Sequence, residues 1–247
     1  MKKNILITGV SGGIGSCLAE QFLEQGATII GLDIVPHSCS AIDFYCCDTR
    51  DAGCVSGVFD EITEKYGFLD ALVNVAGIIG KNSIYRVEDL PYDEWKEVLR
   101  VNLDGTFLVT QKAIPLLKKS DIGGNIVSIS SEQVIRPTEG SAPYAISKAG
   151  VEMLTKILAV ELLDSKIRVN AIAAASVKTD FIRRIVNDSA RLERMFEQRD
   201  AEMPFGIIDV KDVFQAVSFL LSDGNKMTGQ IILMDSGYIL KRHSKKE

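Results

Sequence analysis

The sequence predicts one α/β domain built on a doubly wound parallel sheet of about seven strands. Short apolar runs alternate with longer segments of helical periodicity along the whole chain. The apolar runs are continuous rather than alternating, which is typical of strands buried on both faces by flanking helices. A glycine-rich turn directly follows the first apolar run. Together these patterns indicate a Rossmann-type architecture, in which ligands bind at the carboxyl ends of the strands.

The elements follow in a regular order, with no linker, repeat or low-complexity segment between them. We expect strands at residues 4–8, 27–32, 42–47, 69–73, 125–130, 167–172 and 230–234, and helices at residues 13–25, 51–66, 92–119, 144–163 and 210–221. Gly105 and Pro115 are expected to interrupt the helix at 92–119. Residues 179–206 form the only long stretch without a strand, which we interpret as a helical lid over a substrate. Residues 1–247 are therefore expected to form a single domain.

Composition and charge exclude several classes of function. The net charge of −5 and the sequence pI of about 5.3 argue against a protein that tracks nucleic-acid phosphates, which needs a basic face. The five cysteines are odd in number and form no C-x-x-C pair, so neither a disulfide framework nor a metal site is expected. Because the sequence has no signal peptide and no apolar stretch of about 20 residues, we expect a cytoplasmic protein without membrane contact. The basic tail at residues 241–246 is interpreted as a solvated end.

The turn after the first strand has the composition of a phosphate-binding loop. Glycine lets the backbone turn sharply and approach a pyrophosphate, and the following helix offers free N–H groups and the positive end of its dipole. A glycine-rich turn alone is a common feature, but here a strand precedes it and a helix follows it. We therefore expect a dinucleotide to bind at Gly9, Ser11, Gly12, Gly13, Ile14 and Gly15.

Asp33 follows the second strand, 18 residues after Gly15. A carboxylate at this place accepts hydrogen bonds from the adenosine ribose hydroxyls and repels a 2′-phosphate. No Arg or Lys stands in residues 10–12 or beside Asp33 to receive that phosphate. The sequence therefore favours NAD over NADP as cofactor, the alternative being that Asp33 is only a turn residue.

Tyr144 and Lys148 stand four residues apart at the start of an expected helix and so share one of its faces. A phenol has an ordinary pKa of about 10, and we expect a nearby ammonium, together with the positive nicotinamide ring, to lower that pKa. Tyr144 can then exchange a proton with an alcohol or ketone while hydride moves to or from the nicotinamide. Ser131 closes the fifth strand, where its hydroxyl could hold the substrate oxygen. A lone Tyr-x-x-x-Lys pair is common, but together with the phosphate loop it indicates an oxidoreductase.

Nucleophilic catalysis by a serine triad is disfavoured. The chain has only two histidines, His37 in a short loop and His243 in the charged tail.

Taken in order, these segments resemble the classical short-chain dehydrogenase/reductase family over essentially the full length of the chain. The matching pieces are Thr8-Gly9 with Gly13-Ile14-Gly15, Asp48, Asn74-Val75-Ala76-Gly77, Asn102, Ser131 with Tyr144 and Lys148, Thr228-Gly229-Gln230 and Asp235-Ser236-Gly237. The resemblance implies a catalytic tetrad of Asn102, Ser131, Tyr144 and Lys148. In it, Tyr144 is the acid/base, Lys148 lowers its pKa and holds the nicotinamide ribose, Ser131 stabilises the reacting oxygen, and Asn102 anchors a water that relays protons.

The same resemblance implies further contacts and partners. Asp48 would meet the adenine ring, and further cofactor contacts would come from Asn74, Ala76, Gly77, Val177 and Thr179. The partners would be a small alcohol or ketone substrate and further copies of the chain, in a homotetramer or a dimer. The copies would pack through the helices expected at 92–119 and 144–163.

Three positions depart from the family pattern. Val75 replaces the second Asn of the Asn-Asn-Ala-Gly stretch. Ala174-Ala175 stands where the family usually has Pro-Gly, which puts the geometry of the following loop in doubt. The stretch between Asp33 and Cys46 is short, so the helix that often joins the second and third strands is expected to be missing. A similar shortening is familiar in the dihydrodiol dehydrogenase of catechol-siderophore synthesis.

The leading hypothesis is an NAD-dependent oxidoreductase that interconverts a secondary alcohol and a ketone. The alternatives are a 3-oxoacyl- or sugar-type NADPH reductase and a degenerate dinucleotide-binding sensor or scaffold. The substrate is open. An acidic substrate group could meet one of the arginines of the expected lid, and Glu132 and Arg136 are further candidates for specificity; the lid arginines are Arg183, Arg184, Arg191, Arg194 and Arg199.

Overall fold

The strands form one seven-stranded sheet in which every neighbouring pair is parallel. The computed structural model describes residues 3–80, 85–181 and 188–240. In chain order the strands are β1 (Asn4–Thr8), β2 (Thr28–Asp33), β3 (Asp43–Cys46), β4 (Ala71–Asn74), β5 (Asn125–Ser131), β6 (Arg168–Ala174) and β7 (Ile231–Met234). Their order in space is β3-β2-β1-β4-β5-β6-β7. The direction of winding reverses between β1 and β4, so the predicted doubly wound Rossmann-type sheet is confirmed.

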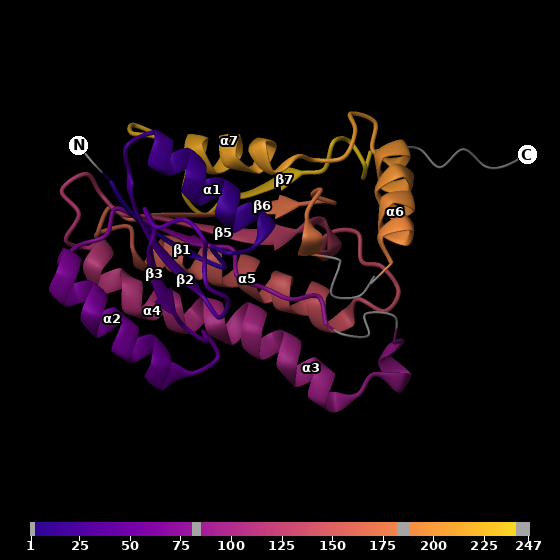
Figure 1. The fold of residues 1–247 in the computed structure, drawn as a ribbon, viewed down its shortest axis with the longest axis horizontal. Coiled ribbons are helices and arrows are strands. Elements are labelled where there is room, and N and C mark those ends of the chain that lie inside the picture. Colours follow the sequence, from indigo (N-terminus) through magenta and orange to yellow (C-terminus); the bar gives the residue numbers. More distant parts are fainter. Residues whose placement is uncertain (1–2, 81–84, 182–187, 241–247) are drawn as a thin grey trace, which may run out of the picture.

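Helices cover both faces of this sheet (Figure 1). One face carries α1 (Gly13–Glu24) and α7 (Val210–Leu221). The other carries α2 (Ala52–Tyr66), α4 (Gly105–Leu117) and α5 (Ala142–Glu161). Two further helices, α3 (Tyr92–Leu99) and α6 (Ser189–Glu202), lie toward the end of the molecule where the strands finish (Figure 1). Two short 3-10 turns, η1 (Val87–Asp89) and η3 (Glu132–Val134), complete the description.

The two faces of each strand supply two separate cores. In β1, Ile5 and Ile7 pack with α1 and α7, whereas Leu6 between them packs with α2, α4 and α5. Successive side chains on a strand point to opposite faces, so a strand that is buried on both faces must be apolar throughout. This is the physical reason for the continuous apolar runs in the sequence.

The long helix expected at 92–119 is divided differently from the prediction. Its axis is interrupted by a π-helical segment, η2 (Arg100–Asp104), in which the N–H of Gly105 donates to the carbonyl of Arg100. Pro115 does not interrupt the helix, because α4 continues to Leu117. A proline so close to a helix end removes one hydrogen bond without preventing the last turn. Gly105 is required for packing, since a side-chain carbon there would lie 2.6 Å from the Thr49 hydroxyl.

The other predicted elements are present with small shifts at their ends. No helix joins β2 to β3, as the short connection predicts, and all residues of that connection are described. The stretch 179–206 contains α6, so its predicted helical character is confirmed for residues 189–202. The lid arginines Arg183 and Arg184, and the basic tail with His243, lie outside the described residues.

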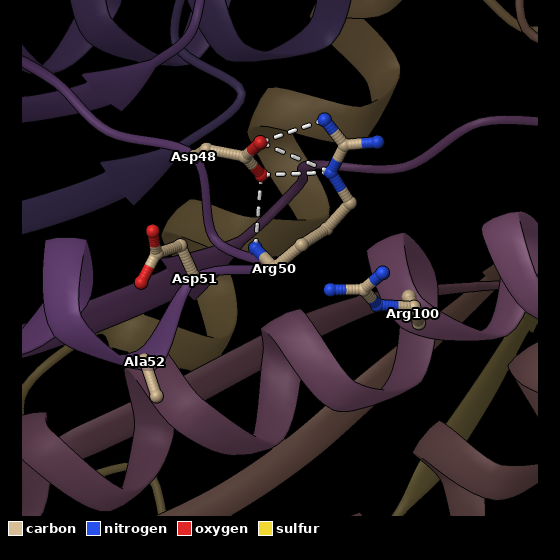
Figure 2. Close-up of a pocket in the computed structure, with 5 residues that line it drawn as sticks. All are labelled: Asp48, Arg50, Asp51, Ala52 and Arg100. Carbon is tan, nitrogen blue, oxygen red and sulfur yellow. Dashed lines mark hydrogen bonds and ion pairs between the residues drawn. The ribbon is translucent and has the colours of Figure 1, made fainter.

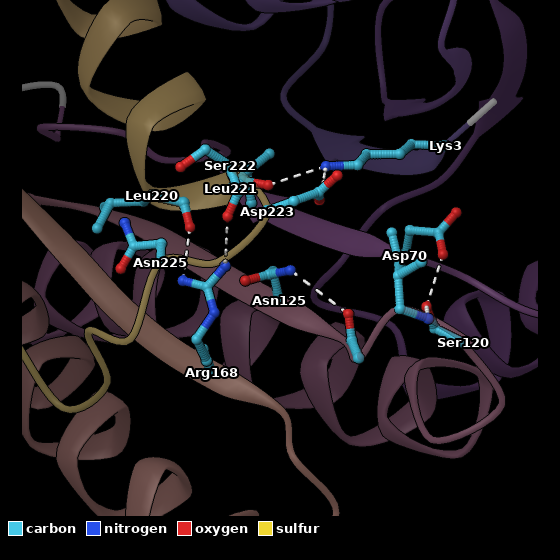
Figure 3. Close-up of polar contacts among 12 residues, drawn as sticks. Lys3, Asp70, Ser120, Asn125, Arg168, Leu220, Leu221, Ser222, Asp223 and Asn225 are labelled. Atoms are coloured by element: carbon cyan, nitrogen blue, oxygen red, sulfur yellow. Dashed lines mark hydrogen bonds and ion pairs between the residues drawn. The ribbon is translucent and has the colours of Figure 1, made fainter. Parts of the chain in front are cut away.

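Polar side chains tie the amino-terminal edge of the sheet together (Figure 3). Lys3 donates to the carbonyl of Leu221 and pairs with Asp223, and Arg168 donates to the carbonyls of Leu220 and Ser222. Cations at the carboxyl end of α7 satisfy its last carbonyls and complement the helix dipole. This edge is therefore occupied by structural contacts, which leaves the opposite edge for a binding site. Within the described ranges, no helix is long and apolar enough to span a membrane.

Candidate active site

The turn between β1 and α1 is held in a form that only glycine permits. Gly9 has a φ of +68°, and a side-chain carbon there would lie 2.8 Å from the backbone of Ala76. A side-chain carbon at Gly15 would lie 2.1 Å from the carbonyl oxygen of Gly9. The N–H of Gly12 donates to that same carbonyl over 3.1 Å. The glycines at positions 9 and 15 are thus dictated by backbone contact.

The first turn of α1 leaves backbone donors free. Gly12 occupies the N-cap position and supplies no side-chain cap. In the part of the chain that the structure describes, no group accepts a hydrogen bond from the N–H of Gly13, Ile14 or Gly15. Free N–H groups at the positive end of a helix dipole are a site for phosphate oxygens. The residues present therefore fit the pyrophosphate of a dinucleotide.

Thr179 reaches this turn from the segment that follows β6. A side-chain carbon at Gly13 would lie 2.9 Å from the methyl carbon of Thr179. The segment that carries Thr179 is anchored by a bridge between Val177 and Ile208 and by the N–H of Lys178, which donates to the Ile208 carbonyl over 2.9 Å. Thr179 is thus brought beside the phosphate loop, while its contact with a cofactor stays a prediction.

Ala174-Ala175 does not distort the start of that segment. Ala174 is the last residue of β6, and the N–H of Ala175 continues the pairing by donating to the Met234 carbonyl over 2.8 Å. Neither alanine has a positive φ, and both are buried in the core. The backbone at Ala174 and Ala175 therefore needs neither proline nor glycine.

Asp33 ends β2 directly beside the phosphate loop. One of its carboxylate oxygens accepts the N–H of Ser11 and the other accepts the N–H of Val35, each over 3.0 Å. The Ser11 hydroxyl donates to the Val35 carbonyl over 2.7 Å, which closes this corner. An ionised carboxylate offers about four acceptor sites, so Asp33 keeps capacity for ribose hydroxyls.

Asp48 is engaged by a residue that the sequence analysis did not single out (Figure 2). Arg50 donates to both carboxylate oxygens of Asp48 from its side chain and also from its backbone N–H, and it pairs with Glu97. The hydrogen bonds from Arg50 hold the pKa of Asp48 below its ordinary value. Arg100 lines the same pocket. Asp48 is thus an ion-paired carboxylate at the edge of this pocket.

The segment after β4 crosses from the phosphate loop to α5. The Thr8 hydroxyl oxygen accepts the N–H groups of Val75 and Ala76 over 3.1 and 3.2 Å. A side-chain carbon at Gly77 would lie 3.2 Å from Asn102 Oδ1 and 3.5 Å from Lys148 Nζ. By contrast, the amide of Asn74 turns into the core.

Asn74 is fixed by two side chains behind the sheet edge. Its Nδ2 donates to Thr110 Oγ1 over 3.1 Å and to Ser128 Oγ over 3.3 Å. The side chain is 4% exposed. At the sheet edge, Asn74 therefore exposes its backbone rather than its side-chain amide.

Asn102 lies in the π-helical segment and is fully buried. Its side-chain amide forms a pair of hydrogen bonds with the backbone of Ile78, over 2.8 and 2.9 Å, and donates to Ser147 Oγ over 3.0 Å. The Asn102 carbonyl accepts the Thr106 hydroxyl over 2.7 Å, and a carbonyl oxygen has a second lone pair. Asn102 thus joins the segment after β4 to the helix that carries Tyr144 and Lys148.

Ser131, Tyr144 and Lys148 lie together where β5 meets α5. Lys148 Nζ donates to the Ile129 carbonyl over 2.8 Å and lies 5.8 Å from the centroid of the Tyr144 ring. The Ser131 hydroxyl lies close enough to the Tyr144 phenol to lower the pKa of Tyr144 in part. The ring of Phe181 lies 6.4 Å from that of Tyr144, and so forms part of the wall of the site.

The ionisation of Tyr144 is set mainly by burial. In the protein by itself, burial raises the pKa of Tyr144, the Ser131 hydroxyl lowers it in part, and the charge of Glu132 raises it. Lys148, whose Nζ donates to the Ile129 carbonyl, is not among the groups that lower this pKa. The lowering expected from the ammonium together with the nicotinamide ring stays a prediction. Burial lowers the pKa of Lys148 to about 8. The site by itself therefore holds a protonated phenol beside an amine that titrates just above neutrality.

Arg199 on α6 belongs to a polar cluster beside the site. Arg199 donates to the Tyr238 hydroxyl over 3.0 Å and pairs with Glu202 over 2.9 Å. The guanidinium of Arg136 stacks on the Tyr238 ring, 4.1 Å from its centroid. Of these residues, the sequence analysis missed Tyr238, whose only signal is that it directly follows the Asp235-Ser236-Gly237 segment. Arg191 and Arg194 are exposed on α6.

Comparison with known proteins agrees with this geometry. A family model described as enoyl-(acyl carrier protein) reductase matches residues 9–239. The chain belongs to the classical short-chain dehydrogenase/reductase family. It is 34% identical to the 3-oxoacyl-acyl-carrier-protein reductase FabG of Thermotoga maritima, over 96% of this chain and 98% of that protein. It is 32% identical to the NADP-dependent (R)-specific alcohol dehydrogenase of Lentilactobacillus kefiri, over 96% of each.

A solved structure of the family superposes on the whole chain. The ligand-free aldohexose dehydrogenase of Thermoplasma acidophilum aligns with a TM-score of 0.91 and 31% identity, over 100% of this chain and 98% of that one. Relatives of this family act as dehydrogenases and reductases, and this chain is a short-chain oxidoreductase of the same kind.

The burial of Lys148 predicts a specific dependence of stability on pH. Between pH 8 and 10.5, Lys148 is neutral in the folded protein and protonated in the unfolded chain, so the unfolded state binds more protons and stability rises with pH. Relative to Lys148→Met, the ligand-free wild type is expected to gain roughly 1 kcal/mol per pH unit across this window, measured by urea unfolding. Lys119→Met, which changes an exposed lysine, is expected to leave the wild-type slope unchanged. Parallel curves for wild type and Lys148→Met would contradict the lowered pKa.

Proposed function

We propose that the protein is an NAD-dependent oxidoreductase that interconverts a secondary alcohol and a ketone. The observation that carries this proposal is the convergence of Ser131, Tyr144 and Lys148 beside a phosphate loop with free N–H donors. The segment after β4 links the two, because its Ala76 contacts Gly9 of the phosphate loop and a side-chain carbon at Gly77 would lie 3.5 Å from Lys148 Nζ. A dinucleotide held at Gly13, Ile14 and Gly15 would therefore extend toward the Tyr144 phenol.

The proposed chemistry divides hydride transfer from proton transfer. A bound nicotinamide supplies hydride to a ketone carbon or takes it from an alcohol carbon. Tyr144 gives its phenolic proton to the ketone oxygen during reduction and takes the hydroxyl proton during oxidation. Ser131 hydrogen-bonds the same oxygen and stabilises the charge that develops on it. The raised pKa of Tyr144 in the protein alone means that the phenol begins as a proton donor.

Lys148 and Asn102 are proposed to restore the proton on Tyr144. The pKa of Lys148, about 8, lets it gain and lose a proton near neutral pH. Its ammonium would also favour the phenolate that remains after reduction. The second lone pair of the Asn102 carbonyl is suited to anchor a water between Lys148 and solvent.

Replacement of Tyr144 by Phe tests the proton-transfer role. Turnover is expected to fall by about 10²–10⁴-fold, because no other group can replace the phenol as acid/base. Binding of NADH, measured by calorimetry, is expected to persist, since the phosphate loop is untouched. Substantial turnover by Tyr144→Phe with a good substrate would remove Tyr144 from this role.

The preference for NAD rests on Asp33. Its carboxylate is fixed by Ser11 and Val35 at the end of β2, where a 2′-phosphate would be repelled. A relative from Lentilactobacillus kefiri is described as NADP-dependent, so the family includes both preferences. The residue at this position therefore has to be tested directly.

Thermal unfolding with NADH and with NADPH at equal concentration distinguishes the two cofactors. A ligand at 100 times its Kd adds roughly 2.7 kcal/mol to the folded state. We expect NADH to raise the midpoint clearly and NADPH to raise it little, and Asp33→Arg to reverse this order. Unchanged selectivity in Asp33→Arg would mean that Asp33 does not read the ribose, and no shift with either cofactor would favour a sensor or scaffold.

We further propose that the described residues 179–181 and 188–206 form a lid over the substrate, within a single domain. Phe181 beside Tyr144, and Arg199 on α6 bonded to Tyr238, support this placement. The relatives are named for 3-oxoacyl-acyl-carrier-protein, alcohols and aldohexoses. A substrate screen therefore begins with these three classes of carbonyl compound and their alcohols.

The outer face of α5 supports a homotetramer. Four apolar residues spaced for one face of α5 are 46–71% exposed, namely Ile146, Met153, Ile157 and Val160. Phe107 of α4 is also exposed and adds to this apolar patch. An apolar face of this kind is characteristic of a protein interface.

Substitution of Val160 tests the interface. Val160→Glu is expected to reduce the mass measured by light scattering below that of four 27.0 kDa chains, since a charge cannot be buried unpaired in an apolar contact. Val87→Glu changes an equally exposed valine on η1 and is expected to leave the mass unchanged. A monomeric wild type at micromolar concentration would contradict the assembly.

A further inference from the structure

The side chain of Glu132 turns back onto Ser131. The Ser131 hydroxyl donates to Glu132 Oε2 over 2.9 Å and accepts the N–H of Gln133 over 3.2 Å. Ser131 ends β5 and caps η3, and only 3% of the residue is exposed. The hydroxyl assigned to the substrate oxygen is thus already bonded on two sides by its own loop.

We propose that Glu132 is a positioning residue that sets the direction of the Ser131 hydroxyl proton, so that Ser131 donates to the substrate oxygen only when Glu132 is protonated. This inference rests on the proposed function, because it concerns the same reacting oxygen. A serine hydroxyl has one proton and two lone pairs. An ionised Glu132 takes that proton in a charge-assisted hydrogen bond, which is roughly twice as strong as a neutral one. The Gln133 N–H already occupies one lone pair of Ser131 Oγ. The substrate then meets only the other lone pair, which can accept a hydrogen bond but cannot donate one.

Protonation of Glu132 reverses this polarity. The carboxyl O–H donates to Ser131 Oγ, and the Ser131 proton becomes free to bond the substrate oxygen. That oxygen carries negative charge in the transition state of both oxidation and reduction, since the two directions share one transition state. A second donor beside the Tyr144 phenol therefore accelerates both directions.

The surroundings of Glu132 set the pH at which this change occurs. Ser131 faces it from β5, Tyr144 from α5 and Arg199 from α6. Burial raises the pKa of Glu132 above its ordinary value of 4.5, while the hydrogen bond with Ser131 and the charge of Arg199 lower it in part. Ionised Glu132 in turn raises the pKa of Tyr144.

Further charged side chains contact the neighbours of Glu132 rather than Glu132 itself. Arg199 is held by Glu202 and by the Tyr238 hydroxyl, and Arg136 stacks on the same Tyr238 ring. The position of α6 therefore controls how strongly a cation acts on Glu132. Lys148 titrates separately, at a pKa of about 8.

The dependence of turnover on pH, measured with saturating NADH and ketone, tests the proposal. The measurement is made at pH values below those at which Lys148 titrates. The wild-type kcat is expected to fall by about 5–10-fold as Glu132 ionises above pH 4.5, the effect of one lost hydrogen bond. In Glu132→Gln the amide can donate to Ser131 at every pH, so this decline is expected to vanish. In Arg199→Met the decline is expected to move to higher pH, because the cation that favours ionised Glu132 is gone.

A second readout does not depend on turnover. In the cofactor-free protein, infrared difference spectra between acidic and neutral pH are expected to contain the C=O band of a protonated carboxyl group that titrates above pH 4.5. This band should be absent in Glu132→Gln and present in Glu139→Gln, which changes an exposed carboxylate in the same loop. Glu139→Gln is also expected to keep the wild-type pH profile.

The outcomes separate this inference from the proposed function. If wild type turns over substrate and Tyr144→Phe does not, while Glu132→Gln keeps the wild-type profile, the role of Glu132 is wrong and the function stands. A fall in kcat of Glu132→Gln by the same factor at every pH would likewise overturn it, because that result reports only a structural contact. If wild type neither binds a dinucleotide nor turns over any carbonyl substrate, the proposed function itself fails; a carboxyl band above pH 4.5 that is lost in Glu132→Gln would still support the protonation of Glu132.

Discussion

The site depends on two hydrogen bonds that the Thr8 hydroxyl oxygen accepts from the N–H groups of Val75 and Ala76. They join the ends of β1 and β4, where the winding of the sheet reverses and where ligands bind in such folds. The approach is so close that only glycine fits at position 9, since any side-chain carbon would meet the backbone of Ala76 at 2.8 Å. The phosphate loop and the segment after β4 are therefore fixed relative to each other by backbone contact.

From this junction a continuous set of hydrogen bonds leads to the helix that carries Tyr144. Ile78 is paired through its backbone with the Asn102 amide, Asn102 donates to Ser147, and Ser147 donates to the Tyr144 carbonyl. The π-helical segment places Asn102 between two elements that a regular helix would space differently. Buried hydrogen bonds of this kind hold side chains in position within the tolerance that catalysis requires.

The same burial that fixes these groups also sets their proton affinities. Tyr144 and Lys148 both keep their neutral forms more strongly than in water, because a buried charge loses its hydration. The site alone is consequently poised with a proton on the phenol, and positive charge must be brought near it to favour the phenolate. Glu132 adds an opposing charge next to Ser131, so the electrostatics of the site are divided between α5, β5 and α6.

The sequence by itself determined the fold class and the shared helix face of Tyr144 and Lys148. These follow from local rules: continuous apolar runs indicate buried strands, and residues four apart share a helix face. It could not determine the π-helical segment around Asn102, the continuation of α4 past Pro115 or the pairing of Arg50 with Glu97. Nor could it determine the raised pKa of Tyr144 or the contact between Arg199 and Tyr238. Each of these depends on which distant segments pack together and on how much water they exclude, and only the tertiary structure fixes both.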